Sequence, residues 1–476
     1  MTQHPPRFHP AAAIPLAAGL VWLWCAASFG IVGFIFSVIP GCLLLSAGVG
    51  MLLWAGDMRM PQFASVGGLL GVPLALPAIF VAGPGTAALL IALSALSFLA
   101  AGRVALRQDP HFPDVPVPEP SLSLYAQVAC DNSILAWMQV SLDLREGEEW
   151  RRISREVFDA AELYDARGWL EKPMDYHRLP PVLENPDIRP ARTRKREYEH
   201  LRFESGYEPW DGEPGSERWD SFTANKTAHA WVLRHPGPPR PWLVGLHGYR
   251  MGMAAIDLLA FEPGYYHERL GMNLLIPVLP LHGPRAIKRS GDRFIGGDPL
   301  DSIHAEAQAM WDLRRLLSWV RAQEAPAVGA MGLSLGGYQT ALLACFDEDL
   351  ACAIAGIPLT DVSRAVWRHA PLLHLLHAER EGIVRDHVAE VLRVVSPLVL
   401  EPKVPHERRY IFGGVADQLV TPDHVRDLWD HWDRPRIAWY QGAHLTFRAH
   451  PHVRRLVRDA LDESGLAPRQ AGPPAR

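Results

Sequence analysis

One short segment of the chain has the residue types and the spacing of a serine nucleophile. The sequence Gly332-Leu333-Ser334-Leu335-Gly336 matches the pattern G-x-S-x-G, which places a serine on a sharp turn between a strand and a helix. An apolar run precedes it at residues 327–333, and a run compatible with a helix follows at 338–346. Glycine on both sides lets the strand and the helix approach closely. We therefore predict a nucleophile elbow with an exposed Ser334 hydroxyl rather than an ordinary glycine-rich turn.

Four segments together resemble the motifs of the α/β-hydrolase superfamily. They are LHGY at 246–249, GLSLGG at 332–337, GGVADQLVTP at 413–422 and QGAH at 441–444. The resemblance extends over residues 200–465 and implies an α/β-hydrolase fold, in which nucleophile, acid and histidine follow one another in this order along the chain.

A serine hydroxyl is a weak nucleophile and needs a neighbouring base. The resemblance implies that His444, which follows the last predicted strand, is this base. It also implies that Asp417 orients the imidazole and stabilises its charged form. The alternatives nearby are the histidines His450 and His452 and the acids Asp361 and Asp423. Asp423 lies at a predicted helix start, where an acid interacts favourably with the helix dipole. As the acid of the triad, Asp417 is preferred to Asp361.

An oxyanion hole needs two N–H donors at fixed positions. The N–H of Leu335, next after the nucleophile, is one expected donor, and the N–H of Tyr249 is the other. The residues expected to contact substrate at the mouth of the site are His247, Gly248, Arg250, His282 and Arg285. His282 and Arg285 suit a substrate carboxylate or phosphate, with packing inside their loop as the competing explanation.

Strand-like and helix-like segments alternate from residue 197 onwards, which favours a mostly parallel sheet with helices on both faces. The expected strands are 198–204, 228–235, 241–246, 272–279, 327–333, 350–357, 409–412 and 436–440, and the expected helices include 302–323, 422–432 and 451–461. The insertion at 362–395 is predicted to form a helical cap whose leucines make an apolar acyl pocket. Its histidines lack a carboxylate or cysteine at metal-ligand spacing, so no metal is expected.

The first quarter of the chain is predicted to be a membrane domain. No charged residue occurs in 10–56 or in 62–102, and one spanning helix needs roughly 20 apolar residues. We expect four spans near 14–37, 41–56, 63–82 and 86–102, with turns at Pro40-Gly41 and at 83–85. The basic flanks Arg7, Arg59, Arg103 and Arg107 then share one side. The positive-inside rule makes that side, and the catalytic domain, cytoplasmic.

The expected organisation is therefore a transmembrane helical domain (1–108), a proline-rich linker (109–120), a helical extension on the hydrolase (121–196), the catalytic domain (197–465) and a disordered tail (466–476). Repeated proline suggests that the linker is a stiff spacer. The basic residues within 189–196 suit a solvated loop, with contact to anionic lipid headgroups as the alternative.

The net charge and the cysteine content argue against several classes of function. A net charge of −5 argues against nucleic acid as the main partner, and the five scattered cysteines suggest neither disulfides nor a metal site. No cofactor is implied. We expect a membrane-anchored serine hydrolase that contacts membrane lipids and cleaves small-molecule or lipid esters. Acyl transfer, peptide cleavage and a silent interaction module are the alternatives. The uncharged helices argue against an ion channel or transporter.

Overall fold

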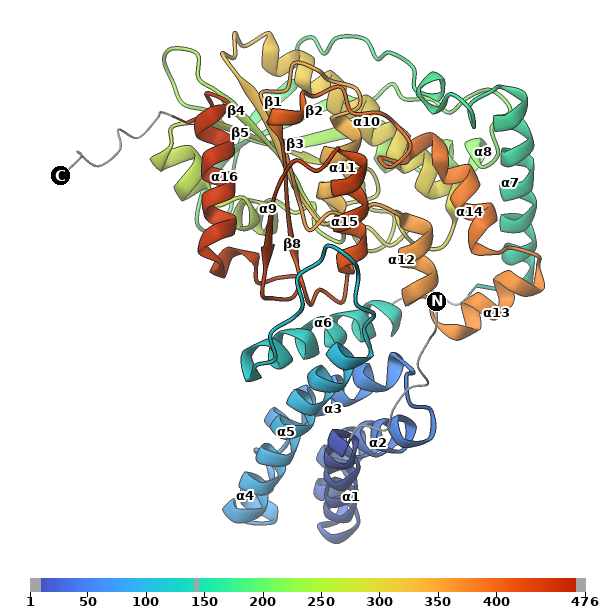
Figure 1. Cartoon of the computed structure of the whole chain (residues 1–476), viewed down its shortest axis with the longest axis vertical. Coiled ribbons are helices and arrows are strands. Elements are labelled where there is room, and N and C mark those ends of the chain that lie inside the picture. The colour runs from blue at the N-terminus through green and yellow to red at the C-terminus, as the bar shows by residue number, and fades with distance from the viewer. Residues whose placement is uncertain (1–9, 141–144, 468–476) are drawn as a thin grey trace, which may run out of the picture. The chain divides into compact units, whose positions relative to one another are not determined.

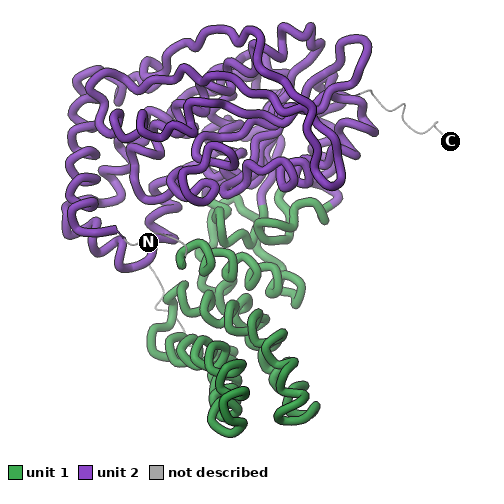
Figure 2. Tube along the Cα trace, turned by 180° about the vertical axis from the view of Figure 1, so that it is seen from behind, with its two compact units in different colours: residues 1–141, 414–423, 439–450 green, residues 142–413, 424–438, 451–476 purple. Residues whose placement is uncertain are grey.

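The computed structural model describes residues 10–140 and 145–467 (Figure 1). Arg7 and residues 468–476 of the expected tail lie outside the described residues, whereas Leu466 and Ala467, also placed in that tail, are buried. The chain forms two compact units (Figure 2). The first combines Met1–Ser141 with Gly414–Asp423 and Trp439–His450, and the second contains the rest.

The N-terminal part of the first unit is helical, as expected. Its helices are α1 (Ala13–Ser28), α2 (Gly30–Leu53), α3 (Arg59–Leu74), α4 (Ala78–Val81), α5 (Pro84–Gln108) and α6 (Leu122–Val140). The turn predicted at Pro40-Gly41 is wrong, because Pro40 lies inside α2. The chain turns instead at Gly30, which has a φ of +62° that glycine adopts without strain. Proline inside an apolar helix is tolerated where neighbouring helices pack around it.

Three of these stretches are long and apolar enough to cross a membrane: Pro10–Ser28, Gly30–Leu53 and Pro84–Gln108. The segment expected to hold the third of four spans is divided between α3, with 16 residues, and α4, with 4 residues. At 1.5 Å per residue α3 is about 24 Å long, somewhat less than the hydrocarbon core of a bilayer.

The proline-rich linker is packed rather than free. The Glu119 N–H donates to Oε1 of Gln441 over 2.8 Å, and Nε2 of Gln441 donates to the carbonyl of Val117 over 3.1 Å. The Gln418 side chain also donates to the carboxylate of Asp109. The linker is therefore not a free spacer, because its two ends are bonded to the acid loop and to the residue after β9. Prolines have no N–H to satisfy, so a few side-chain bonds suffice to hold such an extended segment.

Most of the second unit surrounds a nine-stranded sheet, whose strand order is β1-β2-β3-β5-β4-β6-β7-β8-β9. The strands are β1 (Asp187–Arg192), β2 (Glu197–Glu204), β3 (Thr227–Leu233), β4 (Trp242–Leu246), β5 (Asn273–Val278), β6 (Val328–Leu333), β7 (Cys352–Gly356), β8 (Arg409–Gly414) and β9 (Arg436–Tyr440). Pairing is antiparallel from β1 through β3 to β5 and parallel from β5 through β4, β6 and β7 to β8. All eight predicted strands are confirmed.

Strand β1 was not predicted. It occupies part of the basic segment 189–196 and pairs with β2 as a hairpin at the edge of the sheet. Its Arg189 bonds Asp187 over 3.0 Å, and Arg196 of the turn region bonds Glu268 over 2.5 Å. Residues 189–192 therefore belong to an edge strand, which commonly carries charged side chains, whereas 193–196 form the turn to β2, in which Arg194 and Lys195 are exposed as the prediction of a solvated loop expects.

Helices flank the sheet (Figure 1). They are α7 (Gly147–Ala166), α8 (Ser216–Ser221), α9 (Ala254–Ala260), α10 (Pro299–Arg321), α11 (Leu335–Leu343), α12 (Val362–His369), α13 (Leu372–Arg380), α14 (Arg385–Val391), α15 (Pro422–His431) and α16 (Pro451–Glu463). This is the α/β-hydrolase-like fold that the sequence motifs led us to expect.

The insertion at 362–395 is helical, as predicted, and contains α12, α13 and α14. Its leucines do not line an enclosed pocket, however, because Leu372, Leu373 and Leu376 are 49%, 50% and 52% exposed. His374 and His377 lie against the ring of Trp150, with ring centroids 6.0 and 6.4 Å from it. The predicted acyl pocket is therefore not formed by these leucines.

Candidate active site

Ser334 lies on a strained turn between β6 and α11. Its φ of +59° and ψ of −115° are unusual for any residue with a side chain. Its N–H donates to the carbonyl of Gly356 on the neighbouring strand over 2.9 Å, so the surrounding sheet holds this conformation. Ser334 is partly exposed, whereas Leu333 and Leu335 on either side are buried. Strain of this kind is found at functional sites, and it leaves the serine as the accessible residue of the turn.

The glycines of the motif are required by close backbone contacts. A Cβ atom on Gly336 would lie 1.8 Å from the carbonyl oxygen of Leu246, and one on Gly332 would lie 1.9 Å from that of Gly336. Both contacts are with backbone atoms, which cannot move aside without displacing β4 or α11. The pattern G-x-S-x-G therefore reflects the packing of this turn as well as its chemistry.

We expect Gly336→Ala to destabilise the second unit strongly. Overpacking against fixed backbone costs about 3 kcal/mol, which corresponds to a fall of roughly 6 °C or more in Tm. Thermal unfolding followed by tryptophan fluorescence measures this. The matched control is Gly147→Ala at the start of α7, where a Cβ would meet nothing within 4 Å. Equal melting temperatures for the two variants would contradict the close packing of the elbow.

The two predicted oxyanion donors belong to the start of α11 and to the loop after β4. Leu335 is the first residue of α11, so its N–H has no acceptor within the helix. The loop after β4 runs beside the serine, since a Cβ on Gly248 would lie 3.7 Å from that of Ser334. The Met251 N–H closes a turn onto the carbonyl of Gly248 over 3.3 Å, and this turn carries Tyr249. The arrangement brings the predicted oxyanion loop next to the predicted nucleophile.

His444 and Asp417 form a buried pair in the first unit. Nδ1 of His444 lies 2.6 Å from Oδ2 of Asp417, and Oδ1 of Asp417 accepts the N–H groups of Leu419 and Val420, both over 2.9 Å. The carboxylate therefore accepts a hydrogen bond from Nδ1–H, which leaves Nε2 as the basic nitrogen. Burial alone would lower the pKa of His444, but the carboxylates of Asp417 and Asp131 raise it above the ordinary value.

The competing residues have other contacts. The carboxylate of Asp361 caps α12, where it accepts the N–H of Arg364 over 2.9 Å and the hydroxyl of Ser363 over 2.7 Å. The ring of His450 packs against that of Tyr440 with centroids 4.8 Å apart. Asp423 lies in the first turn of α15. Among the acids considered from the sequence, Asp417 is the one bound to His444.

Several residues expected to contact substrate are instead part of the packing. Arg285 is buried and bonds Asp312 over 2.8 Å and the carbonyls of Val278 and Asn225, each over 3.0 Å. His282 is buried with Nδ1 on the carbonyl of Pro280, and burial lowers its pKa well below the ordinary value. The prediction that these two side chains contact substrate is therefore wrong, because both are buried in the packing of their loop.

The other two side chains of this group are also engaged. Nε2 of His247 accepts the N–H of Leu279 over 3.1 Å, and the ring is fully buried. Arg250 bonds Asp292 over 2.8 Å and has a φ of +63°. Gly248 lies beside Ser334, as predicted. The backbone of this loop is therefore available to a substrate, whereas the side chains of His247 and Arg250 are engaged in other bonds.

Sequence reasoning missed one residue beside the pair. Asp131 of α6 is buried, and its Oδ2 accepts the N–H groups of Gln418 and His444 over 3.1 and 3.0 Å. A signal was present in the sequence: Asp131 shares a helical face with the buried Leu124, Val128 and Leu135, and an acid among apolar residues at this spacing needs a partner. The sequence analysis predicts only a helical extension on the hydrolase for this segment.

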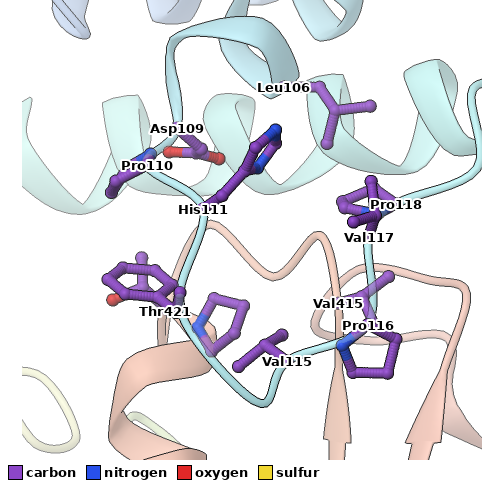
Figure 3. A pocket seen from close by; sticks show the side chains of 12 residues that line it. Leu106, Asp109, Pro110, His111, Val115, Pro116, Val117, Pro118, Val415 and Thr421 are labelled. Carbon is purple, nitrogen blue, oxygen red and sulfur yellow. The ribbon is translucent and has the colours of Figure 1, made fainter.

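A small pocket lies beside the acid loop in the first unit (Figure 3). Its volume is about 50 Å³, which leaves room for only a few water molecules and none for an ester substrate. The end of α5, the linker and the acid loop line it together, with the residues Leu106, Asp109, Pro110, His111, Phe112, Val115, Pro116, Val117, Pro118, Val415, Thr421 and Pro422. The pocket is a packing feature of the linker.

Comparison with known proteins identifies two close relatives. "Uncharacterized protein MT2702" of Mycobacterium tuberculosis (strain CDC 1551 / Oshkosh) is 45% identical over 361 residues, which are 75% of this chain and 86% of the relative. "Uncharacterized protein Rv2627c" of the same species (strain ATCC 25618 / H37Rv) is 44% identical with the same coverage. No protein-family model matches the chain.

Similar solved structures include two esterases and a peptidase. An acetyl xylan esterase from Paenibacillus sp. R4 has a TM-score of 0.42 at 16% identity, covering 60% of this chain and 98% of its own. Acetyl xylan esterase 1 from Thermoanaerobacterium sp. JW/SL YS485 has a TM-score of 0.44 at 14% identity, covering 62% and 93%. An acylaminoacyl peptidase from Pyrococcus horikoshii has a TM-score of 0.38 at 15% identity, covering 58% and 49%.

Proposed function

The chain belongs to the family of the two Mycobacterium tuberculosis proteins, and we propose that it is a serine hydrolase that cleaves carboxylic esters. The observation that carries this proposal is the backbone of Ser334, which is forced to a φ of +59° at a strand–helix elbow. Such strain has no structural benefit of its own, and it presents a hydroxyl in the manner of a nucleophile.

The buried pair of Asp417 and His444 supports the same chemistry. In the proposed mechanism Nε2 of His444 takes the proton of Ser334, and Asp417 holds the imidazole and stabilises its charged form. The strand order of the sheet supports this assignment. β6, which leads to Ser334, is parallel to β7 and β8, and β9 is the next strand in the sheet. Asp417 follows β8 and His444 follows β9, and in parallel sheets functional groups gather at the carboxyl ends of the strands.

The remaining steps follow from this assignment. Ser334 attacks the ester carbonyl, and the N–H groups of Leu335 and Tyr249 stabilise the oxyanion. The imidazolium of His444 then gives its proton to the leaving alcohol, and an acyl group remains on Ser334. His444 next activates a water molecule, which releases the acid and restores the serine.

We further propose that the enzyme is anchored in a membrane with its catalytic domain on the cytoplasmic side. Three apolar helices of sufficient length support the anchor. The orientation follows from Arg59, Arg103 and Arg107 and requires that residues 59–82 also cross the bilayer. Proteolysis in sealed vesicles of known orientation tests it: protection of the catalytic domain in right-side-out vesicles is expected, and cleavage there would contradict the orientation.

The substrate class is tested with a panel of model substrates on the full-length protein. We expect turnover of p-nitrophenyl esters, with longer acyl chains preferred because a membrane-anchored enzyme meets lipophilic substrates. An acyl-aminoacyl p-nitroanilide series is the control for peptidase activity, and product analysis with added alcohol detects acyl transfer, because the same residues support all three reactions. Cleavage of the anilides without cleavage of the esters would contradict the proposal.

A further inference from the structure

Two side chains of α6, one helical turn apart, bind the loop that carries His444. Oε1 of Gln127 accepts the N–H of Ala443 over 3.2 Å and the hydroxyl of Thr446 over 2.9 Å. Oδ2 of Asp131 accepts the N–H of His444 itself over 3.0 Å. Because positions i and i+4 lie on one helical face, α6 presents both acceptors to the same loop.

Asp131 also binds the loop that carries Asp417. The same oxygen, Oδ2, accepts the N–H of Gln418, the residue after Asp417, over 3.1 Å. One carboxylate oxygen thus joins the acid loop to the histidine loop. An apolar residue at position 131 would leave two buried N–H groups without this acceptor, which is unfavourable.

Bracing two loops does not by itself require an acid. The amide oxygen of asparagine could accept both N–H groups, and it would avoid the cost of burying a charge. Asp131 is only 1% exposed, so its charge is costly unless it interacts with something. A buried carboxylate at this position therefore indicates an electrostatic role in addition to the hydrogen bonds.

The groups around Asp131 define that role. Burial, and then the charge of Asp417, raise the pKa of Asp131 to about 7, while His444 and the two N–H groups oppose the shift. Burial and the nearby carboxylates also raise the pKa values of Tyr440 and Cys130, so both remain neutral. His450 packs on Tyr440, and Asp109 bonds Gln418. Of these groups, His444 is the one whose positive charge the ionised carboxylate of Asp131 stabilises, and that positive charge in turn opposes the rise in the pKa of Asp131.

We propose that Asp131 is a positioning residue of the acid–histidine pair, which braces both loops through Oδ2 and supplies a second negative charge to the imidazolium of His444. This inference rests on the proposed function, since it assigns His444 as the base. It also gives the N-terminal part of the chain a role beyond anchoring: α6 belongs to one compact unit with the apolar helices and with residues 414–423 and 439–450.

The decisive variants separate charge from hydrogen bonding. Asp131→Asn keeps the shape and one acceptor oxygen but removes the charge. Gln127→Ala is the matched control, because it removes two bonds from the same loop and changes no charge. The pKa of His444 is measured in each full-length protein by ¹³C NMR with labelled histidine, and His444→Gln assigns the signal. We expect the pKa to fall by roughly one unit in Asp131→Asn and to stay unchanged in Gln127→Ala. Equal pKa values in wild type and Asp131→Asn would overturn the inference.

A kinetic measurement provides a second readout. His444 must be neutral to act as a base, so reaction of Ser334 with a fluorophosphonate should be lost as the pH falls through the pKa of His444. This loss of reactivity at low pH forms the acid limb of the pH profile. Removing the charge of Asp131 should move the acid limb to lower pH by the same amount as the pKa of His444 falls in the NMR titration. Gln127→Ala should slow the reaction without moving the limb. If both variants react more slowly but lose reactivity at the same pH as the wild type, Asp131 has only a structural role and the inference is overturned.

The two proposals fail in different ways. A folded wild type that does not react with the fluorophosphonate would contradict the serine hydrolase, whereas the NMR titration would still decide whether Asp131 stabilises the charged form of His444. Conversely, a reactive wild type whose His444 pKa does not depend on Asp131 would leave the hydrolase in place and remove only the inference.

Discussion

Replacing Ser334 with alanine is expected to lower ester turnover by about 10⁴-fold or more. The loss of the hydroxyl removes the nucleophile, and the remaining oxyanion donors and binding contacts support only a small residual rate. The strained turn tolerates alanine, because alanine keeps the Cβ already present at this position. The variant should therefore melt at the wild-type temperature, and steady-state kinetics on the preferred p-nitrophenyl ester measure the loss.

The matched control for this prediction is Ser133→Ala. The hydroxyl of Ser133 donates to the carbonyl of Ala129 within its own helix, over 2.9 Å. Its removal should leave turnover within about twofold of wild type, as for most substitutions away from special features. Ester turnover by Ser334→Ala at the wild-type rate would contradict the assignment of the nucleophile.

Asp417→Asn is expected to lower turnover by about 10⁴-fold with little change in fold. An asparagine preserves the shape, but it removes the charge that stabilises the imidazolium, and its amide can hold His444 in the wrong tautomer. The short Nδ1 to Oδ2 distance of 2.6 Å makes the pair sensitive to this change. Turnover measured across a range of pH separates loss of the base from a shift in its pKa.

Asp361→Asn is the control for the acid. Asp361 caps α12, and asparagine caps helices about as well as aspartate, so turnover should stay within about twofold of wild type. A strong loss in Asp361→Asn, together with a mild one in Asp417→Asn, would reverse the assignment of the acid.

The sheet and the elbow could be predicted because their signals are local. Apolar runs of five to eight residues ended at turn residues mark β4, β6 and β7, and the bounds of β9 at Arg436–Tyr440 were predicted without error. The elbow needs glycine at fixed positions beside Ser334, so its sequence specifies its geometry. Strand β1 was not predicted because its sequence, DIRPAR, has no apolar alternation. Its extended conformation is stabilised by pairing with β2.

The parts that could not be predicted depend on contacts between distant segments. The linker was interpreted from its prolines alone, whereas the bonds from Glu119 and Val117 to Gln441 span more than 300 positions. The same holds for Asp131, whose partners lie 287 and 313 positions away. Burial of His282 and Arg285 likewise depends on elements that fold over their loop. Residue type suggests chemistry in such cases, but the fold decides which side chains remain accessible.

The most direct test of the central claim is to label full-length protein in membranes with a fluorophosphonate and to map the modified residue by peptide mass spectrometry. The reagent reports an activated serine without any knowledge of the natural substrate. We predict one adduct on Ser334, formed in wild type and absent from Ser334→Ala. A folded wild type that acquires no adduct, or acquires it on another residue in both proteins, would contradict the assignment of this chain as a serine hydrolase acting through Ser334.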